Sequence, residues 1–214
     1  MSDRQIAPFL YLSIAFHAAL VAANLAAVKI VALGPFTVPA GVLAYSITFP
    51  LAETVTELWG RRRAQVVVNA GIMTQLLVWA LLWIAIWAPA APFWTGQPAY
   101  AATLGQGNRI ILASLAAYLV SQTVDVWVFA RLRRRTEGRR LWLRTLAGTV
   151  VAQSLDTVLF IALAFYGAFP VGPLILGQLA VKYALALVDA PLVYALVSGV
   201  RRWLGPGGLP ERID

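Results

Sequence analysis

The sequence predicts an all-α protein, a polytopic transmembrane bundle of six helical spans with both termini cytoplasmic. Three observations support this fold class. Hydrophobic residues make up 60% of the 214 residues, and the mean hydropathy is +0.76. Charged residues make up 12%, whereas soluble domains carry about 25%. Finally, apolar runs of about 20 residues recur along the chain, and each is long enough to cross the hydrocarbon core of a bilayer.

The spans follow one another within a single predicted domain, residues 1–204, with a flexible tail at residues 205–214. A short turn at residues 33–39 separates the first span from the second, which Pro50 interrupts. An uncharged loop at residues 88–107 separates the third from the fourth. The predicted spans cover about residues 9–31, 40–58, 64–87, 109–130, 142–168 and 174–200.

The basic residues predict how the spans are oriented. Three basic clusters, at residues 61–63, 131–144 and 201–202, follow the second, fourth and sixth spans, while the loops after the third and fifth carry no charge. Cytoplasmic loops are enriched in Lys and Arg, so both termini are expected in the cytoplasm. The net charge of +8 therefore indicates contact with anionic lipid rather than with nucleic acid. Arg109, which heads the fourth span, is interpreted as an interfacial anchor.

Two stretches inside the apolar runs each place a glutamine three residues before an aspartate. They are Gln122 with Asp125 in the fourth span and Gln153 with Asp156 in the fifth. Residues three apart share a helix face, so each stretch points an amide and a carboxylate in one direction. A carboxylate at the bilayer centre costs about 2.5–3.5 kcal/mol, which indicates a binding site for a small polar molecule. The alternative interpretation is a structural ion pair that locks the bundle.

The fourth and fifth spans run in opposite directions, so the two stretches are expected to form opposing walls of one acidic cavity. An inverted repeat, as in many transporters, would produce this arrangement. An antiparallel hairpin with matched polar sites would produce it without duplication.

The second span supplies two further acids. Glu53 and Glu57 lie four residues apart on one face, and Pro50 one turn earlier is expected to kink the helix. Glu53 is predicted to contact the substrate. Glu57 is a secondary candidate, because it is equally suited to pairing with the basic residues at 61–63.

The remaining candidates lie on the sixth and first spans. Gln178, Lys182 and Asp189 share a face of the sixth span, and Lys182 is the natural partner for one of the carboxylates. Lys182 and Asp189 are predicted to bind substrate, while Gln178 and Asn24 are secondary candidates.

The acids outnumber the cations in this set, since Glu53, Asp125, Asp156 and Asp189 face one deep lysine. Either some acids are protonated, or the cavity takes a donor-rich ligand. A carboxylate accepts two parallel hydrogen bonds, and a Gln amide supplies a donor and an acceptor, which suits the edge of a guanine-type ring. The residues alone indicate a small solute that is polar and either planar or cationic.

Residues 49–60, Phe-Pro-Leu-Ala-Glu-Thr-Val-Thr-Glu-Leu-Trp-Gly, resemble the acidic signature of the queuosine precursor transporter family, with Glu53 in place of the usual Asp and Trp59 in place of the usual Tyr. The resemblance covers about residues 10–203 and continues through stretches at residues 109–129, 136–139, 142–144, 154–157 and 189–194. It implies six helices in a bacterial cytoplasmic (inner) membrane and uptake of 7-deazaguanine bases, such as 7-cyano- or 7-aminomethyl-7-deazaguanine.

A transporter is therefore predicted rather than an enzyme. The chain has one histidine and no cysteine, which disfavours metal and thiol chemistry, and no cofactor is predicted. It has no phosphate-binding Gly-rich loop with Lys, so transport is expected to be facilitative, ion-coupled or driven by a separate subunit. A substrate-capture subunit of a multi-component importer and a homo-oligomer both remain open, and a membrane-embedded enzyme is the less favoured alternative.

In the predicted mechanism, Asp125 and Asp156 hold the donor edge of the base, and Gln122 and Gln153 read its carbonyl. Lys182 balances the charge. Rocking around Pro50 and Pro191 would alternate access to the site.

Overall fold

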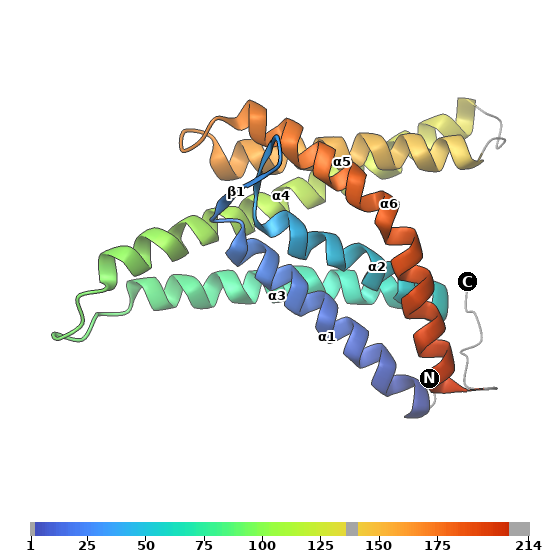
Figure 1. The fold of residues 1–214 in the computed structure, drawn as a ribbon, viewed down its shortest axis with the longest axis horizontal. Helices are drawn as coiled ribbons and strands as arrows, with labels where there is room; N and C mark the ends of the chain where they lie inside the picture. Colours follow the sequence, from blue (N-terminus) through green and yellow to red (C-terminus); the bar gives the residue numbers. More distant parts are fainter. Residues whose placement is uncertain (1–2, 136–140, 206–214) are drawn as a thin grey trace.

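The computed structural model describes residues 3–135 and 141–205, including their side chains except at positions 3, 122, 125–135, 141–149, 186, 189 and 190. Along this part of the chain, six helices and a β-hairpin follow one another (Figure 1). Their order is α1 (Asp3–Ala26), β1 (Ile30–Leu33), β2 (Phe36–Pro39), α2 (Gly41–Trp59), α3 (Arg61–Trp87), α4 (Gln97–Arg135), α5 (Leu141–Phe165) and α6 (Val171–Leu204). The fold is mostly helical, as predicted.

A β-hairpin replaces the end of the predicted first span. α1 ends at Ala26, and the antiparallel strands β1 and β2 pair with Leu33 opposite Phe36. Gly34 occupies the two-residue turn with a φ of 59°, which glycine adopts without steric cost in a hairpin. The prediction of helix as far as Val31 was wrong, and the predicted short turn at residues 33–39 is the second half of a hairpin. β-branched residues in both strands, such as Val31 and Val38, favour extended backbone.

Helix α4 begins earlier than predicted. The expected loop at residues 88–107 ends at residue 96, and α4 continues without a break from Gln97 to Arg135. Pro98 is tolerated at its start, because the first N–H groups of a helix have no helical acceptor. No further proline lies between Pro98 and Arg135, so no proline interrupts α4 after its first turn.

The second and third helices are almost continuous. Gly60 alone separates α2 from α3, with a φ of 85°, and the basic residues 61–63 form the first turn of α3. Pro50 lies inside α2, where its carbonyl accepts a hydrogen bond of 2.6 Å from the Thr54 hydroxyl. The predicted bounds of the second, third, fifth and sixth spans agree with these helices to within about four residues.

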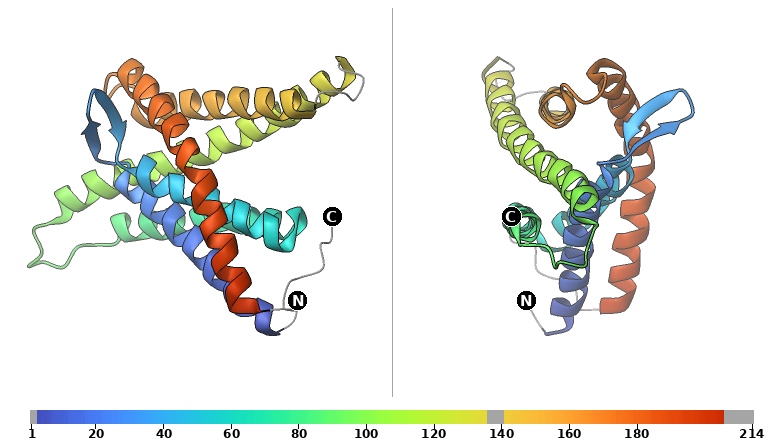
Figure 2. Two further views of the ribbon diagram at one scale, coloured as in Figure 1. Left: turned by 45° about the vertical axis from the view of Figure 1, so that its right-hand side comes forward. Right: turned by 90° about the vertical axis from the view of Figure 1, so that its left-hand side faces the viewer.

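The basic segments gather at one end of the bundle. The start of α1 and the end of α6 lie side by side, since the Tyr11 and Trp203 rings stack with centroids 5.8 Å apart. Arg201 of α6 also lies 3.6 Å from Glu57 near the end of α2. In Figure 1 the end of α4 and the start of α5 also lie on the right-hand side of the molecule, apart from the ends of α1 and α6, and this side is called here the basic end. The hairpin and the α3–α4 and α5–α6 connections lie at the opposite end (Figures 1 and 2). It is called here the uncharged end because these two connections carry no charged residue.

Two apolar clusters pack the bundle, one toward each end. The cluster at the basic end joins α1, α2, α3 and α6, and its buried members include Phe16, Trp59 and Val67. The cluster at the uncharged end joins α4, α5 and α6, and its buried members include Ile110 and Phe165. The middle of the bundle between these clusters is therefore where polar groups and empty space can be accommodated.

Among the described residues, two helical stretches are long enough to cross a membrane. Arg4–Ala26 and Arg61–Trp87 are long and apolar enough to cross a bilayer, and two shorter apolar stretches cover Val150–Phe165 and Val171–Leu185.

Candidate functional site

A cavity of about 350 Å³, called here the main cavity, lies where all six helices meet. Small-molecule sites occupy roughly 300–1,000 Å³, so the main cavity can hold a small planar ring system. The residues that line it are Phe16, Leu20, Tyr45, Thr48, Phe49, Ala52, Gln65, Val68, Gly71, Ile72, Gln75, Ser114, Leu115, Tyr118, Ser121, Ala152, Gln153, Asp156 and Lys182.

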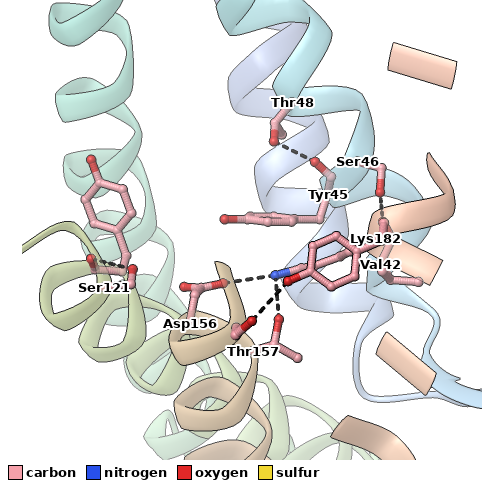
Figure 3. A network of polar contacts seen from close by, with 11 residues as sticks. Val42, Tyr45, Ser46, Thr48, Ser121, Asp156, Thr157 and Lys182 are labelled. Atoms are coloured by element: carbon pink, nitrogen blue, oxygen red, sulfur yellow. Dashed lines mark hydrogen bonds and ion pairs between the residues drawn. The ribbon is translucent and has the colours of Figure 1, made fainter. Parts of the chain in front are cut away.

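An ion pair between α5 and α6 forms the charged part of the wall (Figure 3). The Lys182 ammonium donates to Asp156 Oδ2 at 3.0 Å and to Thr157 Oγ1 at 3.1 Å. Its Nζ also lies 5.3 Å from the centroid of the Tyr45 ring, within the range of a cation–π contact. The prediction that Lys182 pairs with one of the deep carboxylates is confirmed, and the carboxylate is Asp156.

Helix α5 contributes two polar residues to this wall because they lie on one of its faces. Gln153 and Asp156 lie three residues apart and both line the main cavity, as expected for residues on one helix face. Ser154 faces α6 instead, where its hydroxyl lies 3.0 Å from that of Tyr183. Polar contacts from neighbouring residues of α6 thus hold α5 in register with it.

Aromatic rings form much of the remaining wall. Tyr45 and Phe49 lie one turn apart on α2 and pack edge to face, with centroids 5.3 Å apart. Tyr118 contributes a third ring from α4. Tyr45, Phe49 and Tyr118 therefore lie where they could contact a planar ligand.

Two glutamines of α3 line the main cavity but were not predicted from the sequence. Gln65 and Gln75 lie on the same helix face as Val68, Gly71 and Ile72, at the three- and four-residue spacing of one helical stripe. The sequence does contain a signal for them, since Gln65 and Gln75 are two amides within an apolar run. They were overlooked because they carry no charge and therefore look inexpensive on an insertion scale.

A second, smaller cavity of about 30 Å³ lies behind the ion pair. It shares Asp156 and Lys182 with the main cavity and is also lined by Asn24 and Gln178. Asn24 Nδ2 and Gln178 Oε1 are buried and have no hydrogen-bond partner. The volume suits about one or two water molecules, so these two secondary candidates lie next to the predicted site but line a space too small for a ring.

The acids of α2 lie away from the main cavity. Ala52 lines the cavity, whereas the next residue on a helix is turned by about 100°, and Glu53 is exposed. Glu57 pairs with Arg201 of α6 at 3.6 Å, with both side chains about half exposed. The expected partner of Glu57 was the cluster at residues 61–63, and the contact across helices was not visible in the sequence.

Three predicted site residues lie outside the described side chains. They are Gln122, Asp125 and Asp189. Gln153, Asp156 and Lys182 are the predicted substrate contacts that the structure brings together on the main cavity.

One family of known proteins matches the part of the chain that forms most of the main cavity. The family model described as "Putative vitamin uptake transporter" matches residues 39–196, which include every residue of the main cavity except the two from α1. The chain belongs to this family. As a member of the vitamin uptake transporter family, the protein is a membrane transporter and not an enzyme.

A named relative of this transporter supports the resemblance seen in the motifs. The chain is 34% identical over 182 residues to the "Probable queuosine precursor transporter" of Bacillus subtilis (strain 168), and the match covers 83% of this chain and 79% of that relative. The family resemblance inferred from the sequence is confirmed. No solved structure matches the chain.

Proposed function

We propose that this transporter imports 7-deazaguanine precursors of queuosine, such as 7-cyano- or 7-aminomethyl-7-deazaguanine, and binds them in the main cavity. The observation that carries the proposal is the placement of Asp156 in the cavity wall beside Gln153. The carboxylate can accept from the ring N–H and the exocyclic amine of such a base, while the amide donates to its carbonyl. Tyr45, Phe49 and Tyr118 offer faces for stacking.

Lys182 does not prevent Asp156 from binding a base. A carboxylate has two oxygens with about four acceptor sites, and Lys182 bonds to Oδ2. Asp156 can therefore remain ionised and paired while it accepts two hydrogen bonds from a ligand. In this role Lys182 offsets the charge of the site and fixes the carboxylate in position.

The proposed topology is six spans in the bacterial cytoplasmic membrane, with the basic end in the cytoplasm. The gathering of residues 61–63 and 201–202 at one end of the bundle supports it, since Lys and Arg are retained on the cytoplasmic side. Asp125, Gln122 and Asp189 complete the proposed substrate contacts. Rocking around Pro50 and Pro191 would then expose the main cavity to each side in turn.

Rescue of queuosine synthesis tests the proposed function. The gene is expressed in cells that lack both precursor synthesis and their own importer, and queuosine in tRNA is measured with 7-cyano- or 7-aminomethyl-7-deazaguanine in the medium. Restored queuosine supports the proposal. Failure with both bases, when the protein is present in the membrane, would move the substrate to another nucleobase-like or vitamin-like solute.

Purified protein decides between a self-sufficient importer and a substrate-capture subunit. Proteoliposomes that contain this chain alone should accumulate or equilibrate the labelled base if it transports by itself. Binding without entry would instead indicate that separate energising subunits are needed.

A further inference from the structure

Gln75 of α3 is the most deeply buried amide on the main cavity. It is 2% exposed and lines the cavity, and among the described residues neither Nε2 nor Oε1 has a hydrogen-bond partner. Trp79 Nε1, one turn further along α3, is also without a partner, so these two groups do not satisfy each other. Gln75 therefore belongs to the cavity wall and keeps a buried donor and a buried acceptor on one side chain, both without a partner among the described residues.

Buried polar groups are nearly always hydrogen-bonded, because an unpaired one keeps the full cost of leaving water. A Gln amide presents a donor and an acceptor side by side. Its matching ligand is one with an adjacent acceptor and N–H donor on a single edge. Such an edge satisfies both Gln75 atoms at once, as a pair of parallel hydrogen bonds.

We propose that Gln75 is a specificity-determining substrate contact that reads the N3/N9–H edge of a purine-like free base. This inference rests on the proposed function. When Asp156 accepts from the N1–H and 2-amino groups of a deazaguanine, the edge that carries the N–H of the five-membered ring presents an adjacent acceptor and donor, N3 and N9–H. Gln75 Nε2 then donates to N3, and Oε1 accepts from N9–H.

The assignment explains how the cavity would select a base over a nucleoside. A sugar or a methyl group at N9 removes the donor and leaves Gln75 Oε1 unpaired in a buried site. Sites that hydrogen-bond a polar group discriminate strongly against ligands that lack it, because the partner is left unsatisfied. Gln75 therefore acts on specificity as well as on affinity.

Binding of two probes to purified full-length protein tests this role. The probes are 7-cyano-7-deazaguanine and its N9-methyl derivative, measured by calorimetry with wild-type protein and with Gln75→Ala. Wild-type protein should prefer the free base by at least about 10-fold, as expected for one to two lost hydrogen bonds. In Gln75→Ala the affinity for the free base should fall about 10-fold or more, and the preference should shrink to near one.

Asn108→Ala is the matched control. Asn108 is 4% exposed, and both of its polar side-chain atoms are unpartnered, but it lines neither the main nor the small cavity. This variant should keep the wild-type preference. If Gln75→Ala does not fold, Gln75→Asn is used, and its shorter amide should give an intermediate preference.

The outcomes separate this inference from the proposed function. If wild-type protein binds the free base and the Gln75 variant keeps the full preference, another group reads N9 and the role of Gln75 is overturned. A loss of affinity that is equal for both probes overturns the edge assignment as well. If wild-type protein binds neither probe, the proposed function and the inference both fall.

Discussion

The Lys182 ammonium lies 3.0 Å from Asp156 Oδ2, and the two side chains are 3% and 18% exposed. This pair joins α6 to α5 directly at the main cavity (Figure 3). The pair could serve only to hold α5 and α6 together, or Asp156 could also bind the substrate. The two roles predict different effects on uptake and stability when one charge is removed and when both are removed.

Replacing Asp156 with Asn should abolish uptake of the labelled base while leaving membrane insertion intact. An amide has one acceptor oxygen, and its NH2 group would face the second donor, so it cannot accept two parallel hydrogen bonds as a carboxylate does. The Lys182 ammonium is also left buried without a counter-ion. Breaking a buried pair costs up to about 3–5 kcal/mol, so the melting temperature in detergent should fall as well. Uptake, membrane abundance and thermal unfolding are measured together, and near-normal uptake would refute the assignment.

The double variant Asp156→Asn with Lys182→Met separates binding from stability. Removing both charges eliminates the uncompensated ammonium, so most of the lost stability should return. Uptake should remain absent, because the acceptor for the base is still missing. A double variant that regains both stability and uptake would show that the pair is only a structural lock.

Periodicity and composition were sufficient for the helices but not for the hairpin. Long apolar runs predict where helices lie, because they reflect burial over many residues. The orientation inferred from the basic clusters stays a prediction. The strands at residues 30–39 were missed because four-residue apolar segments fit either structure. The early start of α4 at Gln97 was missed because Gly105 and Gly107 resemble a loop but do not stop a helix by themselves.

The charged part of the site was easier to predict than its neutral part. Asp156 and Lys182 stand out in an apolar run because an isolated charge there is costly. A pair between Lys182 and one of the carboxylates was therefore predicted, but not which carboxylate. Glu53 stands out for the same reason, yet it lies on an exposed face, since local spacing does not fix helix rotation. Gln75 carries no charge and was overlooked, and only its burial against the cavity reveals it.

Arg109 is predicted to cap α5 rather than to act as a simple interfacial anchor. Its guanidinium donates to the carbonyls of Leu163 and Tyr166, both at 2.8 Å, at the end of α5 where carbonyls lack helical partners. Arg109→Lys keeps a charge that could anchor at an interface, but it cannot span both carbonyls. This variant should lose about 1 kcal/mol of unfolding free energy in detergent. Unchanged stability would support the anchor interpretation inferred from the sequence.

Close backbone contacts at two glycines are predicted to set the helix packing. A Cβ on Gly41 would collide with the Ala23 carbonyl of α1, and one on Gly177 with the Thr37 carbonyl of β2. Each Gly→Ala change should destabilise the protein by about 1–3 kcal/mol, as measured by thermal unfolding. Gly105→Ala is the control, because its Cβ would meet open space and Ala is the better helix former. Equal effects at all three sites would contradict this close packing against α1 and β2.

The cysteine-free sequence makes the proposed topology directly testable. Phe93, in the α3–α4 connection, is 88% exposed, and Arg202 is exposed near the end of α6. Because the chain has no cysteine, Phe93→Cys and Arg202→Cys each give a single thiol, and the unmodified protein is the blank. A membrane-impermeant maleimide should label position 93 in intact cells but position 202 only after permeabilisation, because the proposed topology places the basic end in the cytoplasm. Labelling of position 202 from outside, or of both positions, would overturn the assignment of the basic end and with it the direction in which the main cavity must open to admit substrate.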